Sequence, residues 1–194
     1  WQMLAGKRVI DHTLNAFKEH RNIDTILVVL HPEDQNRLTD PAIKTALGGA
    51  TRNQSVFNGL RALRAAAPKQ VLIHDVARPL ISAKCITDVI EALQTHAGAA
   101  PALPITDALW RGQDGLVSET VARNNLFRAQ TPQGFDFQSI LQAHAQACGT
   151  AADDVEVAMQ AGLDVKIIAG HEENIKITLP EDFERASKIM KDQR

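Results

Sequence analysis

The sequence predicts a doubly wound α/β fold, in which helices cover both faces of a mostly parallel sheet. Short β-branched apolar segments alternate with longer helical patterns, an order typical of βαβ units with right-handed crossovers. In addition, a glycine-containing turn opens a helix at Gly48–Ser55, and a buried strand within Val71–Pro79 ends on Asp75 and Arg78. Ligands of such sheets bind outside the carboxyl ends of the strands, where helix N-termini favour phosphates. These segments therefore predict a nucleotide-binding crevice.

The N-terminal half of the chain contains clear periodic segments. Val9, Ile10, Leu14 and Phe17 recur at helical spacing and predict a helix over Val9–Lys18. The same reasoning predicts, in order, a strand at Thr25–Leu30, a helix at Arg52–Ala66, a strand at Gln70–His74, a helix at Ser82–Thr95 and a strand at Ala99–Leu103.

A β-hairpin is expected at Thr106–Thr120, where polar and apolar residues alternate irregularly around the turn Arg111–Gly115. A two-stranded ribbon that projects from a sheet is only marginally stable alone, so we expect a second subunit to pack on it. The remaining predicted elements are a loop at Arg123–Gly134, helices at Phe137–Ala147 and Asp153–Ala161, strands at Val165–Ile168 and Ile175–Thr178, and a helix that begins at Pro180.

Composition excludes several classes of protein. The 194 residues fit one domain, and a net charge of −2 supplies no overall basic field for nucleic acid or anionic lipid. Apolar runs are far shorter than the roughly 20 residues of a membrane span, so no membrane partner is expected. Cys85 and Cys148 form no CxxC pair, which argues against a zinc site and favours a cytoplasmic location with both thiols packed in helices.

Asp75, Arg78 and Lys176 are the side chains best placed for chemistry. At a strand end, Asp75 and Arg78 either line a ligand site or only cap a turn and form a surface pair. Lys176 lies among β-branched residues, from which it either points to solvent or aims an ammonium group at a phosphate. The pattern leaves both alternatives open for each residue.

Asp153, Asp154 and His74 favour structural roles. Both aspartates stand just before a helix, where carboxylates accept free amide hydrogens. His74 is expected to form a hydrogen bond within its turn rather than act as a base. The sequence contains neither a GxSxG elbow nor a Walker or GxGxxG loop, which removes support for hydrolases, kinases and dehydrogenases.

Taken in order, these segments resemble the 2-C-methyl-D-erythritol 4-phosphate cytidylyltransferase family, the CTP-dependent enzymes of non-mevalonate isoprenoid biosynthesis. Each motif is weak alone, but the ordered set covers nearly the whole chain. The matching segments are Gly48–Ser55, His74–Pro79, Pro104–Asp107, Arg123, Gln130–Gln133, Asp153–Asp154, Glu173–Thr178 and Pro180–Asp182.

The resemblance implies a Rossmann-like nucleotidyltransferase fold and a defined reaction. A phosphate oxygen of methylerythritol phosphate attacks the α-phosphorus of CTP, which forms the CDP-linked product and releases pyrophosphate. This chemistry needs positioning and positive charge more than a strong base. Mg²⁺ is the implied cofactor, because it neutralises charge on the departing pyrophosphate; the sequence assigns no metal ligand.

The same resemblance implies roles for individual residues. Gly49, Arg52 and Ser55 line the cytosine side of the site. Asp75 contacts a sugar or substrate hydroxyl, and Val76 and Arg78 shape the crevice.

Phosphate and substrate contacts come from other segments. Lys176 approaches the α-phosphate, and Thr131 helps to bind methylerythritol phosphate. In this family the arms of two subunits interlock, so Asp107 and Arg123 are expected to serve the neighbour's substrate site in a homodimer. Ala108 stands where the family has a threonine, which removes one expected phosphate contact.

The family also implies a segment before Trp1. It opens with a strand and a loop, ending in Pro-Lys-Gln, that wraps the CTP phosphates, and Trp1 aligns just after it. Residues 1–194 are therefore expected to form one cytidylyltransferase domain without this strand and phosphate loop. We expect the phosphate loop to be mobile when no ligand is bound. The alternative is that the chain is an inactive fragment. Some family members are fused to a cyclodiphosphate synthase, and the sequence neither supports nor excludes one.

Two other functions remain open at this stage. A cytidylyltransferase for a related polyol phosphate, such as ribitol 5-phosphate, shares the crevice motifs. A non-catalytic nucleotide-binding or dimerisation module, from a different class, would keep the fold without the phosphate loop. Turnover with each polyol phosphate separates the two enzymes, and a mass measurement of the full-length protein discriminates the non-catalytic module.

Overall fold

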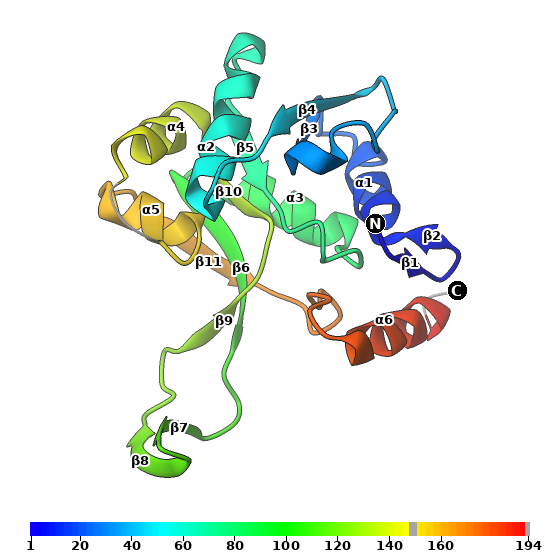
Figure 1. The fold of residues 1–194 in the computed structure, drawn as a ribbon. Helices are drawn as coiled ribbons and strands as arrows, with labels where there is room; N and C mark the ends of the chain where they lie inside the picture. The colour runs from blue at the N-terminus through cyan, green and yellow to red at the C-terminus, as the bar shows by residue number, and fades with distance from the viewer. Residues whose placement is uncertain (148–150, 193–194) are drawn as a thin grey trace.

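A five-stranded sheet forms the centre of the computed structural model, which describes residues 1–147 and 151–192 (Figure 1). Its strands follow the order β11–β6–β10–β5, and β9 pairs with β6. The elements along the chain are β1 (Met3–Leu4), β2 (Lys7–Arg8), α1 (Val9–Lys18), β3 (Ile26–Leu30), η1 (Pro32–Asp34), β4 (Ile43–Leu47), α2 (Arg52–Leu63), η2 (Arg64–Ala66), β5 (Gln70–Ile73), α3 (Ala83–Ala92), β6 (Gly98–Pro104), β7 (Leu109–Gln113), β8 (Leu116–Val121), β9 (Phe127–Ala129), β10 (Gln133–Asp136), α4 (Phe137–Gln146), α5 (Asp154–Gln160), β11 (Val165–Ala169) and α6 (Pro180–Asp192).

The principal strands of this sheet run in one direction. β11 is parallel to β6, while β10 runs antiparallel to both β5 and β6 and lies between them. β5, β6 and β11 are therefore mutually parallel, as in the predicted doubly wound fold. β10 and β9 are the antiparallel exceptions.

Helices pack on both faces of the sheet. Val71 of β5 belongs to a core cluster with Phe135, Phe137 and Ile140, beneath α2, α4 and α5. Leu72, the next residue, packs instead against the cluster of α1 and α3 that includes Ile86. Because successive strand residues point to opposite faces, this alternation produces the two helical layers.

β3 and β4 form a separate parallel pair beside α1 and α2. Gly59 of α2 allows close packing there, since a Cβ at this position would lie 2.8 Å from a side-chain carbon of Val29. In the described part of the chain, β3 pairs only with β4 and β5 pairs only with β10, so each has one edge without a strand partner.

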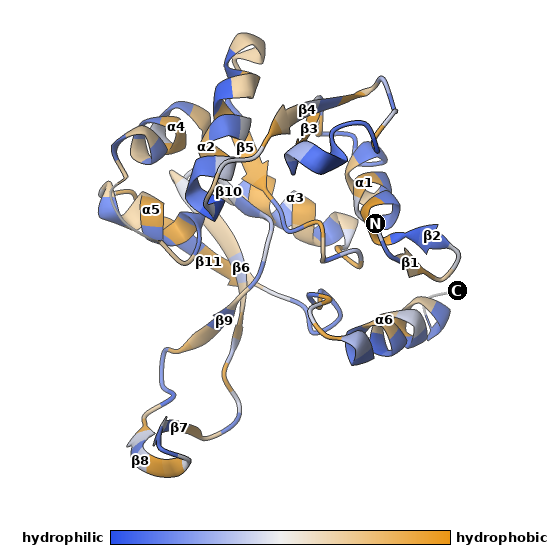
Figure 2. Ribbon diagram, in the orientation of Figure 1, coloured by the Kyte–Doolittle hydropathy of each residue, from blue (hydrophilic) through white to orange (hydrophobic). Residues whose placement is uncertain are grey.

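The predicted hairpin is confirmed and projects from the body of the molecule as β7 and β8, here called the arm (Figure 1). Its turn has Asp114 and Gly115 at φ 52° and 80°, the left-handed conformation that a tight hairpin turn requires. Hydrophobic residues occur on β8 of the arm (Figure 2). Among the arm side chains, Trp110 is 66% exposed and Leu116 74%.

Two sequence predictions of local structure are wrong. Ile175–Thr178 is not a strand: it has no regular secondary structure and lies beside the turn after β5, where Ile177 N–H donates to the carbonyl of Ala77. The predicted loop Arg123–Gly134 contains β9 and the start of β10, which pair with distant strands.

The cysteine and membrane predictions have separate outcomes. Cys85 is buried in α3, as expected of a packing residue, and burial raises the pKa of its thiol to about 11. Cys148 lies outside the described residues. Among those described, no helix is both long and apolar enough to cross a membrane.

Candidate active site

One wall of the candidate site is the loop between β4 and α2. Thr51 caps α2 by accepting a hydrogen bond from Gln54 N–H. Gly49 N–H donates to the hydroxyl of Ser55 over 3.0 Å, and that hydroxyl lies 2.9 Å from the carbonyl of Thr51. A Cβ on Gly49 would lie 2.1 Å from the side chain of Gln54, so this tight approach requires glycine. The structure thus brings together the predicted residues Gly49, Arg52 and Ser55.

Arg52, the first residue of α2, is held by a carboxylate that lies 102 residues further along the chain. Its Nη1 and Nη2 donate to Oδ1 and Oδ2 of Asp154 over 3.1 and 2.5 Å. Burial lowers the pKa of Arg52, but the hydrogen bonds and charge of Asp154, with smaller effects from Asp75 and Asp153, leave it raised. Arg52 is therefore a fixed cation at the crevice.

Asp153 and Asp154 have different roles, although the sequence favoured capping for both. Asp153 caps α5 by accepting from Glu156 N–H, and its other oxygen accepts from Gln133 Nε2. Asp154 has a side chain with no exposed surface, and it binds Arg52 and His144. The amide oxygen of Gln133 accepts the backbone N–H of Asp154, which ties β10 to the start of α5.

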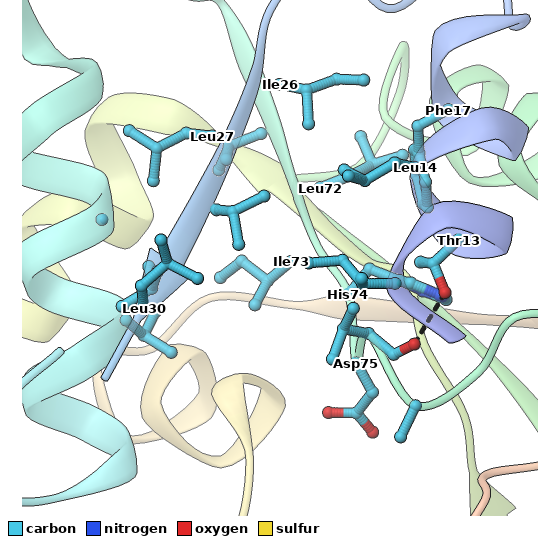
Figure 3. A pocket seen from close by; sticks show the side chains of 18 of the residues that line it. Thr13, Leu14, Phe17, Ile26, Leu27, Leu30, Leu72, Ile73, His74 and Asp75 are labelled. Carbon is cyan, nitrogen blue, oxygen red and sulfur yellow. Dashed lines mark hydrogen bonds between the residues drawn. The ribbon is translucent and has the colours of Figure 1, made fainter. Parts of the chain in front are cut away.

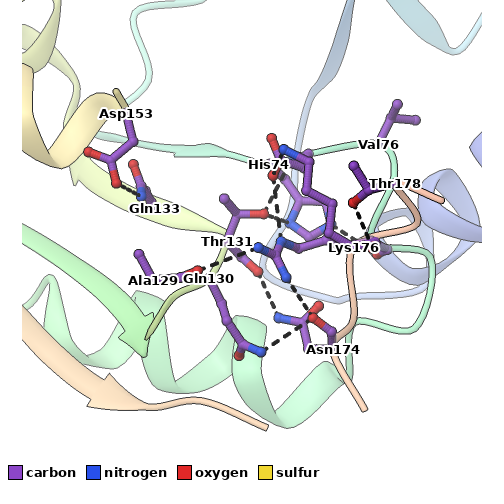
Figure 4. Close-up of polar contacts among 12 residues, drawn as sticks. His74, Val76, Ala129, Gln130, Thr131, Gln133, Asp153, Asn174, Lys176 and Thr178 are labelled. Carbon is purple, nitrogen blue, oxygen red and sulfur yellow. Dashed lines mark hydrogen bonds and ion pairs between the residues drawn. The ribbon is translucent and has the colours of Figure 1, made fainter. Parts of the chain in front are cut away.

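The opposite wall of the crevice gathers charge at the carboxyl end of β5 (Figure 4). Lys176 Nζ lies 3.1 Å from Oδ2 of Asp75, and Arg78 Nε lies 3.5 Å from the same oxygen. Arg78 also donates to the carbonyl of Asn174 over 2.7 Å. The pKa of Arg78 is lowered, because the effect of burial is larger than the opposing effect of the Asp75 carboxylate. Three predicted site residues thus converge, although Lys176 arrives on a loop rather than a strand.

His74 and Thr131 form the support beneath Asp75. Since a carbonyl only accepts, His74 donates from Nε2 to the carbonyl of Arg78, and its Nδ1 accepts from the Thr131 hydroxyl. That hydroxyl also accepts Asp75 N–H over 3.1 Å. Burial lowers the pKa of His74 to about 4, so the ring is neutral near pH 7. The expected turn role of His74 is confirmed; Thr131 is buried, and its proposed contact with substrate stays a prediction.

The other predicted site residues divide between the crevice and the arm. Val76 follows Asp75 and is 45% exposed at the crevice. Asp107 and Arg123 are exposed at the two ends of the arm, just before β7 and just after β8. In Figure 1 the arm continues from the carboxyl end of β6, which runs parallel to β5 in the same sheet. Within the described residues, neither side chain forms a hydrogen bond or ion pair with a residue of the crevice.

An apolar cavity of about 870 Å³ lies between β3 and β5 (Figure 3). Consecutive residues of both strands line it, so it borders strand edges rather than one face of a sheet. Leu14 and Phe17 of α1 and Leu60 of α2 complete its apolar lining, while His74 and Asp75 stand at its polar end. The chemistry of the interior does not suit a triphosphate, whereas the polar end does.

The side chains that could bind a metal ion do not cluster within residues 1–147 and 151–192. No group of three or more His, Cys, Asp or Glu side chains there is placed to hold a metal ion. Asp75 is the carboxylate that lies within 3.5 Å of both Lys176 and Arg78.

A glycine loop at the carboxyl end of β4 and cations at the carboxyl end of β5 are typical of nucleotide-binding α/β proteins, the class that includes nucleotidyltransferases. The family model described as 2-C-methyl-D-erythritol 4-phosphate cytidylyltransferase matches residues 1–192. The chain belongs to this family, so the predicted family, fold class and cytidylyltransferase activity are confirmed.

Relatives and solved structures agree with this assignment. The chain is 48% identical to a 2-C-methyl-D-erythritol 4-phosphate cytidylyltransferase of Cereibacter sphaeroides, over 98% of this chain and 87% of that protein. It is 50% identical to a bifunctional IspD/IspF enzyme of Rhodobacter capsulatus, of which it spans 51%. The cytidylyltransferase structure from Thermus thermophilus superposes with a TM-score of 0.86 at 33% identity, covering 97% of this chain and 92% of that one.

Proposed function

We propose that the chain transfers CMP from CTP to 2-C-methyl-D-erythritol 4-phosphate in isoprenoid precursor biosynthesis, and that the crevice between Gly49 and Asp75 is the reaction site. The observation that carries this proposal is the convergence of Lys176 and Arg78 on Asp75, opposite the β4–α2 loop. A phosphate oxygen of the substrate forms a bond to the α-phosphorus, the bond to the β-phosphate oxygen breaks, and pyrophosphate leaves with the electron pair.

Lys176 is the proposed catalytic cation. Its side chain is 47% exposed and, within the described residues, its Nζ is held only by the partly exposed carboxylate of Asp75, so it can turn towards an incoming phosphate. There it stabilises the negative charge that builds around the α-phosphorus. Asp75 then accepts a hydrogen bond from a sugar or substrate hydroxyl.

Arg78 has a more fixed part in the proposal. Its side chain is only 12% exposed, and the carbonyl of Asn174 holds it. It therefore keeps Asp75 oriented and, with Val76, shapes the crevice.

The base side of the proposed site is the β4–α2 loop. The exposed backbone of Gly49 and the half-buried hydroxyl of Ser55 are held in one geometry by their mutual hydrogen bond. Such groups match the donors and acceptors on the edge of cytosine. Arg52 contributes a positive charge to the same wall.

Mg²⁺ enters this proposal as the companion of the triphosphate. Mg²⁺ in phosphoryl-transfer sites uses substrate phosphates together with one or two carboxylates, and Asp75 is the carboxylate available here. When bound, the ion neutralises charge on the pyrophosphate leaving group.

The cytoplasmic location expected from the sequence stays a prediction.

We also propose a homodimer in which the arm of one subunit reaches the crevice of the other. Trp110, Leu116 and Val117 are 66%, 74% and 56% exposed, a concentration of apolar surface suited to a protein partner. A second copy is the partner that the position of Asp107 and Arg123 favours, because both residues flank this arm and the family resemblance assigns both to substrate binding, Arg123 at the substrate phosphate.

The cavity between β3 and β5 supports the predicted strand before Trp1. Two unpaired strand edges border an apolar space, and a single inserted strand pairs with both edges while filling it. Trp1 and Gln2 line this cavity too, so a preceding segment has a short path into it. A parallel strand there ends beside Asp75, and its following loop covers the proposed phosphate site.

The proposal is tested by pyrophosphate release from CTP and Mg²⁺ with methylerythritol phosphate, and separately with ribitol 5-phosphate. Faster turnover with methylerythritol phosphate is expected, and faster turnover with ribitol 5-phosphate would favour the alternative enzyme. Background turnover with both, from protein that carries the segment before Trp1, would favour a non-catalytic module.

A further inference from the structure

His144 and Asp154 form a buried pair next to Arg52. The proposed reaction gives neither residue a role. The side chains of His144 and Asp154 are 1% and 0% exposed, and their Nε2 and Oδ1 atoms are 3.1 Å apart. Asp154 Oδ1 and Oδ2 also accept the two hydrogen bonds from Arg52. A buried carboxylate between a histidine and an arginine is costly unless every partner is in place.

We propose that Asp154 and His144 are positioning residues that fix the guanidinium of Arg52 for binding CTP. This inference rests on the proposed function, because it assigns the held arginine to the nucleotide side of that site. Neither residue touches the nucleotide in this proposal; both act through Arg52.

The geometry favours positioning over simple charge neutralisation. Two parallel hydrogen bonds fix the plane of the Arg52 guanidinium, whereas a single ion pair would leave it free to rotate. His144 donates from Nε2 to Asp154 and so fixes the carboxylate in turn. Asp154 N–H donates to the Gln133 amide, which fixes the backbone that carries the carboxylate.

Arg52 retains free capacity for a ligand. A guanidinium has five N–H donors, and Asp154 takes one from each terminal nitrogen. The Arg52 side chain is 38% exposed and lies on the helical turn that also carries Ser55. Its remaining donors are therefore available to CTP, while Lys176 serves the reacting phosphate on the other wall. Loss of positioning should thus weaken CTP binding more than it slows chemistry.

The ionisation states agree with this arrangement. Burial raises the pKa of Asp154, but hydrogen bonds from His144 and Arg52 outweigh it and the pKa is lowered. The carboxylate is therefore ionised near pH 7 and accepts from both partners.

The primary test compares Asp154→Asn with Asp153→Asn as a matched control. Asp153 is the adjacent carboxylate and caps α5, yet it hydrogen-bonds Glu156 and Gln133 rather than Arg52. Asp154→Asn should raise the KM for CTP about tenfold with kcat within about twofold. Asp153→Asn should lower the melting temperature and change the KM for CTP much less than Asp154→Asn, because Asp153 is linked to Asp154 only indirectly, through Gln133. Equal changes in KM for both variants would contradict the inference.

A double-mutant cycle separates positioning from a general effect on the fold. In an Arg52→Ala background, Asp154→Asn should change the KM for CTP by less than about twofold, because the group it positions is gone. Independent multiplication of the two single effects would show that Asp154 does not act through Arg52, and would overturn the inference.

His144 offers a conservative rescue. His144→Gln keeps an N–H donor and should retain a KM near that of the parent, whereas His144→Phe keeps the ring size without the donor and should raise it. An equal KM in both variants would contradict the role of His144.

A separate readout keeps this inference distinct from the proposed function. The Nη signals of Arg52 in ¹⁵N NMR spectra should report restricted rotation in the parent and free rotation in Asp154→Asn. If the parent shows no turnover with CTP, the proposed function fails, and these spectra still test the positioning. Identical Arg52 signals in the two proteins would overturn the inference. The spectra need no turnover, so this result counts even if Asp154→Asn is too unstable for kinetic measurements.

Discussion

The crevice and the arm differ in how their polar side chains are held. In the crevice, Asp75 has Lys176 and Arg78 within 3.5 Å, and buried Asp154 binds Arg52. On the arm, the ion pair between Arg111 and Glu119 is 68% and 57% exposed. Such an exposed pair contributes little to stability, whereas buried partners fix geometry.

This difference indicates what each region requires to function. The walls of the crevice are organised by contacts within one chain, from residues far apart in the sequence. The arm instead presents apolar surface, including Leu116 at 74% exposure, which no element of the same body covers in the described residues. We infer that the crevice is preorganised and that the arm becomes organised on a second copy.

The largest expected effect is on Lys176. Replacing it with alanine should lower kcat about 10²- to 10³-fold, because the proposed stabilisation of the α-phosphate is lost. The melting temperature should change little, since the side chain is 47% exposed. Steady-state pyrophosphate release measures the effect, and Lys166→Ala, an exposed lysine on β11, is the control. A kcat within tenfold of the parent would remove Lys176 from the catalytic role.

The next effect tests the preorganised crevice through pH. Burial lowers the pKa of His74 from 6.5 to about 4, so the unfolded chain binds a proton more readily than the folded one between these values. The free energy of unfolding should therefore fall as pH decreases from about 6.5 to 4, by about 3 kcal/mol from this group. Above pH 7 its contribution should be constant.

Urea unfolding at several pH values measures this dependence. His74→Gln keeps a donor for the carbonyl of Arg78 but does not titrate, so its stability should fall less over the same range. Parallel curves for the two proteins would show that His74 is not held neutral by burial.

The smallest of these effects concerns the apolar surface of the arm. Trp110→Ser should raise the dimer dissociation constant about tenfold, in line with burial of an aromatic side chain at an interface. Analytical ultracentrifugation measures the constant. Met159→Ser is the control, because Met159 is also exposed, at 65%, but lies on α5. Equal constants for the two variants would place the interface elsewhere.

Local signals made part of the fold predictable from sequence. The helix Val9–Lys18 has the predicted bounds, because its apolar residues recur at helical spacing. The turn at Asp114–Gly115 follows from residues that tolerate positive φ. Strands β9 and β10 were missed because their short sequences form strands only through pairing with β6 and β5.

The candidate site was predictable in its parts but less so in its connections. Sequence patterns and the family resemblance named Asp75, Arg78 and Lys176, and the fold brings them together. The link from Arg52 to Asp154 spans 102 residues and leaves no local pattern, so a capping role for Asp154 was the natural expectation. His144 carried no signal, since isolated histidines are common on helices.

Subunit mixing tests most directly whether the crevice and a partner's arm form one active site. Arg123→Ala and Lys176→Ala chains are each expected to be inactive, because each lacks one half of every site. After verified subunit exchange at equal concentrations, about half of the dimers are mixed and each has one intact site, so about a quarter of the parent activity should return. Recovery near that level is the predicted result, and none would contradict a site shared between subunits.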